Sequence, residues 1–180
     1  MNLYSEKAAT TRNSMTGQYL KGLATYLPIV DSLGRPLDHR GAPLRLITNR
    51  TMLMTKSRTI SNYWLTAIQP ENYIEINRMD ARWLGLSDGD LVWVISATNP
   101  QGVWNYGPGL SKPMIGRVRT SYHIRPGVAT FELGWGHWAY GATAQEIDGQ
   151  LVPGDPRRGA GIHANAAMYV DPYLRSPLSD

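Results

Sequence analysis

The chain has 180 residues, a formal net charge of +4, 42% hydrophobic residues and 18% charged residues. This composition is typical of an ordinary globular chain and excludes a disordered one, and no run approaches the roughly 18 apolar residues of a membrane helix. The lack of cysteine excludes disulfides and iron–sulfur ligation by this chain, and the four histidines show no metal-ligand spacing.

The N-terminal segment is polar and rich in turn-forming residues, without a strong hydrophobic period. Asp31 to Pro36 predicts a turn. The segment also lacks the apolar run of a secretory signal. We expect residues 1–42 to form an N-terminal arm or wrapping segment, followed by one domain over residues 43–180.

Short strands are expected in the rest of the chain, because 18 Gly and 12 Pro indicate frequent turns. Leu44 to Thr48 is a short apolar stretch that predicts a strand, ending at the polar Asn49-Arg50-Thr51. Tyr73 to Ile76 alternates between faces as a half-buried strand does.

A helix and a second strand follow. Asn77 has the chemistry of a helix N-cap, and Met79 to Leu84 predicts a short helix that Gly85 ends. Ser87 to Asp90 predicts a turn, and Leu91 to Ala97 predicts a buried strand.

Some residues in this stretch invite a functional interpretation, but a structural one is simpler. Asp88 and Asp90 resemble an acid–base pair, yet Asp-Gly-Asp between a helix end and a strand is typical of a turn. The large apolar residues are expected in the core: Trp83, Leu84, Val92, Trp93 and Val94.

Two longer segments are expected to be irregular. Asn99 to Pro113 is rich in Gly and Pro and predicts a long excursion, after which strand pairing resumes at Ile115 to Thr120. A turn at Arg125 to Gly127 leads into a strand at Val128 to Leu133. Gly141 to Gly159 predicts an exposed loop, long enough to suggest function or contact with another domain.

Four segments in chain order carry a family resemblance: Pro43 to Arg50, Tyr73 to Trp93, Ile115 to Trp135 and Gly161 to Asn165. Together they resemble the C-terminal pterin-dinucleotide-binding domain of the dimethyl sulfoxide reductase family of molybdenum and tungsten oxidoreductases. The resemblance implies a mainly β fold, a double-psi β-barrel with short flanking helices. The arm and the residues around Asn62 are most similar to the tetrathionate and arsenate reductase branch.

The resemblance implies a first group of cofactor-binding residues. The family's Thr-Gly-Arg-like turn corresponds to Thr48-Asn49-Arg50, where Asn replaces the usual Gly and tolerates positive φ. The family's polar stretch along the pterins is similar to Thr55 to Thr59, although His is absent here. We expect binding from Ser57, Arg58 and Thr59, because hydroxyl and guanidinium groups suit phosphate.

A second group comes from the later segments. His137 and Trp138 follow Gly134 and Gly136, and glycine lets a backbone approach a ligand closely. Asn165 carries an amide that suits the edge of a pterin or a guanine. No catalytic residue and no metal ligand are expected from this chain.

By this resemblance the chain clamps the phosphates and pterins of a molybdenum or tungsten bis(molybdopterin guanine dinucleotide). The cofactor would be shared with domains absent from this chain, so the isolated chain is not expected to be catalytic. The parent would be a respiratory reductase such as tetrathionate reductase, exported in folded form. Its partners would be the remaining domains and an electron-transfer iron–sulfur subunit, with no membrane span and no nucleic acid.

Two other functions stay open. A free-standing double-psi barrel also serves as a partner-binding module, and then Arg50, Arg58, His137 and Asn165 should scatter over the surface. Alternatively, exposed aromatic residues with nearby Arg would stack on a nucleic acid or glycan, and their burial would count against this function. The candidate stacking residues are Trp104, Tyr106, Trp135, Trp138 and Tyr140.

Overall fold

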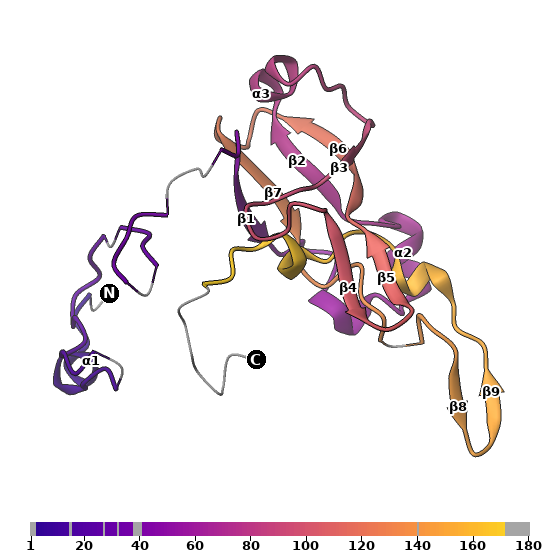
Figure 1. The fold of residues 1–180 in the computed structure, drawn as a ribbon, viewed down its shortest axis with the longest axis horizontal. Coiled ribbons are helices and arrows are strands. Elements are labelled where there is room, and N and C mark those ends of the chain that lie inside the picture. Colours follow the sequence, from indigo (N-terminus) through magenta and orange to yellow (C-terminus); the bar gives the residue numbers. More distant parts are fainter. Residues whose placement is uncertain are drawn as a thin grey trace. The chain divides into compact units, whose positions relative to one another are not determined.

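The computed structural model describes residues 3–14, 16–26, 28–31, 33–37, 41–139 and 141–171. The chain divides into two compact units, Met1–Asp38 with Asp171–Asp180, and His39–Val170. All of the sheets lie in the second unit, and the fold is mainly β with a few short helices, as expected (Figure 1). Among the described residues, no helix has the length and apolar character needed to cross a bilayer.

The described part of the first unit is held by short local contacts. Helix α1 (Glu6–Thr10) begins after Ser5, whose hydroxyl accepts a backbone hydrogen bond from the first turn. The turn predicted after Asp31 is confirmed, because the Asp31 carboxylate accepts a hydrogen bond from the backbone N–H of Arg35 at 2.9 Å. Ser32 in this turn lies outside the described residues.

A five-stranded mixed sheet forms the centre of the second unit: β1 (Arg45–Asn49), β2 (Tyr73–Asn77), β3 (Leu91–Trp93), β6 (Ile115–Ser121) and β7 (Val128–Glu132). The strand order is β1-β7-β2-β6-β3. β1 pairs with β7 and β2 with β6 in parallel, while β2 with β7 and β3 with β6 are antiparallel. Because β1 and β7 are parallel, their carboxyl ends meet at one edge of the sheet.

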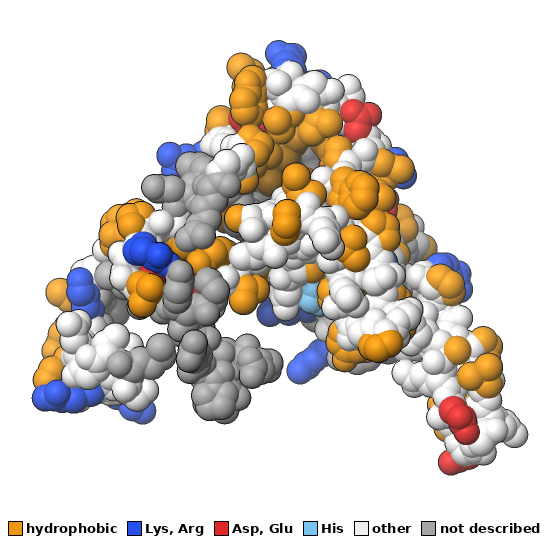
Figure 2. Space-filling model, viewed as in Figure 1, with side chains coloured by type: hydrophobic (Ala, Val, Ile, Leu, Met, Phe, Trp, Pro, Cys, Tyr) orange, Lys and Arg blue, Asp and Glu red, His pale blue; other side chains and the backbone are white. Residues whose placement is uncertain are grey.

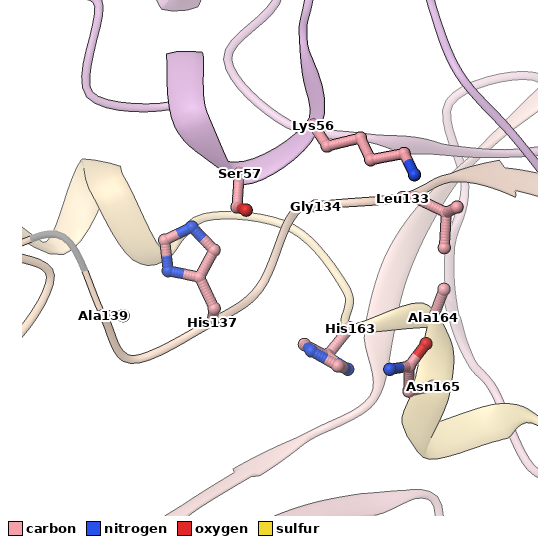
Figure 3. Close-up of a pocket in the computed structure, with 9 residues that line it drawn as sticks. All are labelled: Lys56, Ser57, Leu133, Gly134, His137, Ala139, His163, Ala164 and Asn165. Atoms are coloured by element: carbon pink, nitrogen blue, oxygen red, sulfur yellow. The ribbon is translucent and has the colours of Figure 1, made fainter.

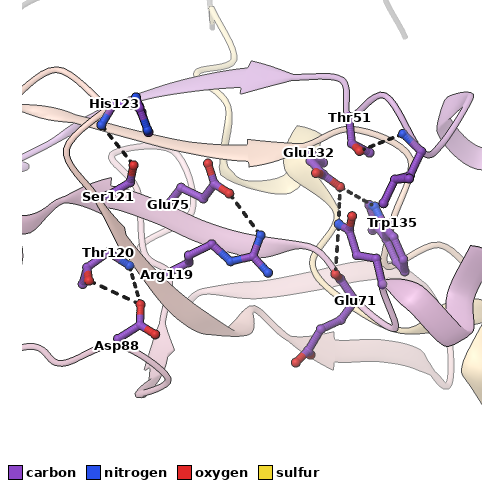
Figure 4. Close-up of polar contacts among 12 residues, drawn as sticks. Thr51, Glu71, Glu75, Asp88, Arg119, Thr120, Ser121, His123, Glu132 and Trp135 are labelled. Atoms are coloured by element: carbon purple, nitrogen blue, oxygen red, sulfur yellow. Dashed lines mark hydrogen bonds and ion pairs between the residues drawn. The ribbon is translucent and has the colours of Figure 1, made fainter.

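The two faces of the sheet differ, as the alternation in β2 predicted. Ile74 and Ile76 are buried and pack with Phe131 in the core. On the other face, Arg119 pairs with Glu75 at 3.4 Å and lies 3.7 Å from the centre of the Tyr73 ring (Figure 4). Such exposed ion pairs contribute little to stability, at most about 1 kcal/mol.

Helix α3 (Arg78–Trp83) begins and ends close to its predicted limits. The Asn77 side chain accepts a hydrogen bond from the backbone N–H of Met79 at 2.8 Å, as an N-cap does. Gly85 follows the helix with a positive φ of 71°. Asp80 accepts a hydrogen bond from the backbone N–H of Gly127 at 2.7 Å, which ties α3 to the turn before β7.

Asp88 and Asp90 are turn residues in the structure. Asp90 accepts a hydrogen bond from the backbone N–H of Ser87 at 2.8 Å. Asp88 accepts one from the backbone N–H of Thr120 at 2.7 Å (Figure 4). Both carboxylates therefore receive backbone donors: Asp90 closes the turn, and Asp88 holds the turn against β6.

Trp83 and Trp93 are not core residues, so that prediction was wrong: 71% and 58% of their surfaces are exposed. Trp83 ends α3 on its outward side, and hydrophobic side chains gather at the surface near this helix (Figure 2). Trp93 lies on the outward face of β3, which is an edge strand. The buried strand predicted at Leu91 to Ala97 is shorter, and only Val92 and Val94 pack against the core.

Both segments predicted to be irregular contain β-hairpins, so that part of the prediction was wrong, although the strands of the second segment are exposed as predicted. In the first, β4 (Val103–Gly107) pairs with β5 (Leu110–Pro113). In the second, β8 (Gln145–Ile147) pairs with β9 (Gln150–Val152) and extends away from the sheet, with acidic side chains at its tip (Figures 1 and 2). Asp148-Gly149 adopts the positive φ values, 51° and 76°, that a two-residue hairpin turn requires.

Candidate functional site

A cavity of about 370 Å³ opens where the chain leaves β7. Its lining comes from three segments that are far apart in the sequence, and Figure 3 shows their side chains around one opening. This is the arrangement expected when separate loops bind one ligand. The lining residues are Lys56, Ser57, Leu133, Gly134, His137, Ala139, His163, Ala164 and Asn165.

Two glycines allow these segments to meet. A Cβ atom at Gly134 would overlap the backbone of Lys56 and Ser57, and Gly134 also has a positive φ of 97°. A Cβ atom at Gly136 would overlap the backbone of Ile162 and His163. We expected these glycines to admit a ligand, whereas the structure shows that they admit close packing between segments of the chain.

Trp135 anchors the loop between the two glycines. It is 1% exposed and packs with Met54 and Ile60, which flank the 3₁₀ helix η1 (Lys56–Thr59). Its indole N–H donates to the Glu132 carboxylate at 3.2 Å (Figure 4). Burying an aromatic side chain of this size contributes about 3 kcal/mol, and it removes Trp135 from the candidate stacking residues.

Asn72 fixes the third segment. Its amide donates to the carbonyl oxygens of Glu132 at 2.9 Å and Ile162 at 3.0 Å, and its oxygen accepts from the Ile162 N–H at 2.8 Å. Asn72 is only 1% exposed. It therefore joins the end of β7 to the residues before the 3₁₀ helix η3 (Ala164–Ala167), where the cavity lining resumes.

Among the described residues, the cavity lining carries basic groups and no carboxylate. Burial lowers the pKa of His137, and the charge of Lys112 lowers it further, while a hydrogen bond with the Ala139 backbone opposes the shift. Burial also lowers the pKa of His163, with His137 and Lys112 adding to the effect. Both imidazoles are therefore uncharged at neutral pH, and each ring can donate and accept hydrogen bonds beside the Lys56 ammonium.

An aromatic cluster adjoins the two histidines. Trp104 on β4 stacks on His163 with ring centres 4.0 Å apart, and it tilts against Trp138 at 5.8 Å. Lys112 on β5 pairs directly with Trp104 across the hairpin. The Lys112 ammonium donates to the Gly159 carbonyl oxygen at 2.9 Å and lies 4.8 Å from the centre of the Trp138 ring.

The structure brings Ser57, His137 and Asn165 to the cavity, and Trp138 to the adjoining cluster. The other predicted binding residues do not line it. Thr48 and Asn49 pair with β7 along β1, Arg50 and Arg58 are exposed, and the Thr59 hydroxyl accepts a hydrogen bond from the backbone N–H of Thr55 at 2.9 Å. Tyr140, a candidate stacking residue, lies outside the described residues.

Four residues of the site were not among the predicted cofactor-binding residues: Lys56, Trp104, Lys112 and His163. Lys56 and His163 lie beside predicted binding residues, in Thr55 to Thr59 and in Gly161 to Asn165, so the neighbouring residues were a usable signal. Trp104 and Lys112 reach the site only because β4 pairs with β5, in a segment predicted to be irregular. No local pattern in the sequence indicates that register.

The donor set suits an organic ligand better than a bare metal ion. In the described part of the chain, no three His, Asp or Glu side chains gather as metal ligands would. The buried His163 Nδ1 and Trp138 Nε1 atoms have no hydrogen-bond partner among the described residues. An acceptor-rich ligand would satisfy these groups, which otherwise cost free energy.

The chain is similar in sequence to known proteins of one family. Residues 44–103 match a family model described as "Molydopterin dinucleotide binding domain". A selenate reductase subunit of Mesobacillus selenatarsenatis is 43% identical, over 99% of this chain and 17% of that protein. A tetrathionate reductase subunit of Salmonella typhimurium is 28% identical, over 96% and 16%. The molybdopterin-containing subunit of the Chrysiogenes arsenatis arsenate respiratory reductase is 26% identical, over 76% and 16%.

The chain therefore carries a molybdopterin dinucleotide-binding domain. It belongs to the molybdopterin oxidoreductase family, with relatives named as selenate, tetrathionate and arsenate reductase subunits. This confirms the resemblance seen in the sequence. The chain spans only 16% to 17% of the length of these three relatives.

Proposed function

We propose that this chain clamps the dinucleotide cofactor of a much larger reductase subunit. Residues 43–180 would be the cofactor-binding domain, with residues 1–42 as an arm against the rest of the subunit. The single observation that carries the proposal is the cavity, where three distant segments bring donors together and no carboxylate is found among the described lining residues. The two parallel strand pairs support a double-psi barrel as the architecture of this domain.

Four polar side chains at the cavity have a role in this proposal. Lys56 offers a charge and the Ser57 hydroxyl a donor to phosphate oxygens. Asn165 and His163 offer donors and acceptors that suit the edge of a pterin or a guanine. A volume of about 370 Å³ is near the small end of ligand pockets, so the cavity would hold one portion of a dinucleotide.

The remainder of the cofactor would lie against other domains of the subunit. The proposed cofactor is a molybdenum or tungsten bis(molybdopterin guanine dinucleotide), and when bound its metal centre supplies oxygen-atom and electron transfer. This chain positions the cofactor and donates hydrogen bonds to it. We propose that the parent is an exported respiratory reductase of an oxyanion such as selenate or tetrathionate, to which an iron–sulfur subunit donates electrons.

The cofactor content of the parent subunit tests this function. We expect Ser57→Ala with Asn165→Leu to lower bound metal and releasable guanosine monophosphate by about tenfold or more, because hydrogen bonds to charged groups contribute about 1.5–3 kcal/mol each. The matched control is Arg119→Met on the outer face of the sheet. Full cofactor content in the cavity variant would show that the cavity does not hold the cofactor.

A nucleic-acid or glycan binder is less well supported than the cofactor clamp. Trp135 is buried, and Trp104 and Trp138 pack against each other and against Lys112 and His163. Of the described candidate stacking residues, Tyr106 is the most open, with 67% of its surface exposed.

A further inference from the structure

We infer that Lys112, Trp138 and His163 form an oxyanion subsite beside the cavity, and that it takes a phosphoryl group. We name a phosphate of the proposed dinucleotide cofactor as the occupant, and this identification rests on the proposed function. Lys112, Trp138 and His163 all lie beyond residues 44–103, the part of the chain that matches the family model.

Lys112 offers a charge and spare donors. An ammonium group has three donor hydrogens, and the Gly159 carbonyl oxygen accepts one at 2.9 Å. Among the described residues, the ion pairs include none with Lys112. Burial lowers the pKa of Lys112 to about 8, so most Lys112 side chains are still protonated and charged at pH 7. A half-buried charge with spare donors is well suited to bind an anion.

Trp138 and His163 add donors from two other segments. An indole N–H can only donate, so the buried Trp138 Nε1, which has no partner in the described part of the chain, requires an acceptor. The buried His163 Nδ1 atom also has no partner in the described part of the chain. It becomes a donor when the ring carries its proton on Nδ1. Buried polar groups are nearly always satisfied, which points to an acceptor from outside the described residues, and we infer that a ligand supplies it.

The cluster is rigid enough to keep these donors together. Trp104 contacts both residues: it pairs with Lys112 across the β4–β5 hairpin and stacks on His163 with ring centres 4.0 Å apart. The Lys112 ammonium lies 5.4 Å from the Trp104 ring and 4.8 Å from the Trp138 ring. Cation–π contacts and the Gly159 hydrogen bond therefore hold the ammonium in place before any ligand arrives.

A phosphoryl group fits this donor set. Its several oxygens accept hydrogen bonds from different directions, while its charge pairs with the ammonium. A cation is disfavoured because the local side chains are basic, and no carboxylate lines the adjoining cavity. The same chemistry comes from a nucleotide tail or from a free inorganic anion, so both serve as probes.

The test uses the 180-residue chain with pyrophosphate and guanosine diphosphate as probes at low ionic strength. Near-ultraviolet circular dichroism first establishes that each variant is folded. Nuclear magnetic resonance then follows the Trp138 indole N–H and the His163 ring, with Trp138→Phe to assign the indole signal. We expect both signals to shift with either probe, and the dissociation constant to rise at least about tenfold in Lys112→Met.

Lys21→Met in the exposed part of the first unit is the matched control and should bind like the wild type. Lys112→Arg keeps the charge and should retain most of the affinity. Lys112→Gln removes the charge and replaces Lys112→Met if that variant does not fold, with the same loss of affinity expected. Unshifted Trp138 and His163 signals, or equal affinity in the wild type and the Lys112→Met variant, would overturn the subsite.

The result is separable from the proposed function. Pyrophosphate binding through Lys112 together with full cofactor content in the Ser57 and Asn165 variants would keep the subsite and reject the cavity as a cofactor clamp. Tighter binding of guanosine diphosphate than of pyrophosphate would support the nucleotide tail as occupant. Equal binding would overturn that identification and leave a general oxyanion subsite.

Discussion

At the residue scale, the cavity depends on a few buried polar side chains that join distant segments. Asn72 is the main one, because its three hydrogen bonds hold the Ile162 backbone and the end of β7 together. A buried amide that satisfies three backbone groups stabilises the fold mainly because its loss leaves those groups without partners.

We predict that Asn72→Ala lowers the free energy of unfolding by about 2–4 kcal/mol, because two carbonyls and one N–H lose their buried partner. Urea unfolding followed by tryptophan fluorescence measures the change. The matched control is Asn62→Ala, which removes the exposed cap of helix α2 (Tyr63–Ile68) and should cost only about 1 kcal/mol. Equal losses in the two variants would show that Asn72 is not the link between the segments.

Lys112 gives a pH dependence with a definite sign. Burial lowers its pKa from the usual 10.5 to about 8 in the folded chain. Between these values the unfolded chain binds more protons, so the free energy of unfolding rises with pH in that window. The shift alone corresponds to about 3 kcal/mol, and screening of a partly exposed amine reduces the expected effect to about 1 kcal/mol.

The measurement compares the gain in stability from pH 7 to pH 10 in the wild type and in Lys112→Met. The comparison removes the effects of other titrating groups, which the two proteins share. We predict a gain about 1 kcal/mol larger in the wild type. A gain of the same size in both would mean that the ammonium is not desolvated.

At the scale of elements, the site exists because η1, the loop after β7 and the segment before η3 pack backbone against backbone. Gly134 makes the first of these contacts possible, with φ at 97° and no room for a Cβ atom against Lys56 and Ser57. Gly109 in the β4–β5 turn is the useful comparison, because its φ is also positive, 74°, but nothing lies within 4 Å of its Cβ position.

We predict that Gly134→Ala destabilises the chain by about 2–4 kcal/mol, whereas Gly109→Ala costs about 1 kcal/mol, since only the first adds a steric clash to the strained φ. Thermal and urea unfolding report both changes. Gly134→Ala should also broaden the Ser57 and His137 amide signals, which lie on either side of the contact. Similar costs for the two variants would contradict the close packing seen here.

Much of the element structure could be predicted locally. The alternation of Ile74 and Ile76 predicted β2, and Asn77 and Gly85 marked the limits of α3. Hydrophobicity alone misplaced Trp83 and Trp93, because a large apolar residue at a helix end or on an edge strand does not have to be buried.

The two hairpins were missed for different reasons. Asp148-Gly149 is a strong turn signal that the loop prediction overlooked. The β4–β5 hairpin turns at Pro108-Gly109, which is also a turn signal, but its register shifts between Asn105 and Gly107. That register decides where Trp104 and Lys112 lie, and the sequence pattern does not show the shift.

At the scale of the whole molecule, the family resemblance predicted binding residues that meet at one cavity: Ser57, His137 and Asn165. Asn165 ends the last of the four family-like segments, while Ser57 lies in the polar stretch Thr55 to Thr59 and His137 lies just after the third segment. The order of the segments could not predict which side chain in each segment faces the cavity. A 3₁₀ turn directs Ser57 inward and leaves Arg58 exposed, and this depends on how Trp135 and Ile60 pack beneath η1.

The selenate, tetrathionate and arsenate reductase subunits that the chain matches are much longer than the chain itself. Because the chain spans 17% of the selenate reductase subunit that it matches, most surfaces of the proposed larger subunit would lie outside this chain. Exposed apolar residues on α3 and β3, including Trp83 and Trp93, are compatible with burial against those parts. The proposed cofactor site does not depend on these exposed surfaces and concerns the cavity alone.

The most direct measurement is a structure of the parent subunit, determined with its cofactor bound and at a resolution that locates the phosphates and pterin rings. The account predicts cofactor atoms within hydrogen-bonding distance of the Ser57 hydroxyl, the His163 ring and the Asn165 amide. It would be contradicted by a cofactor bound elsewhere while side chains of another domain fill this cavity.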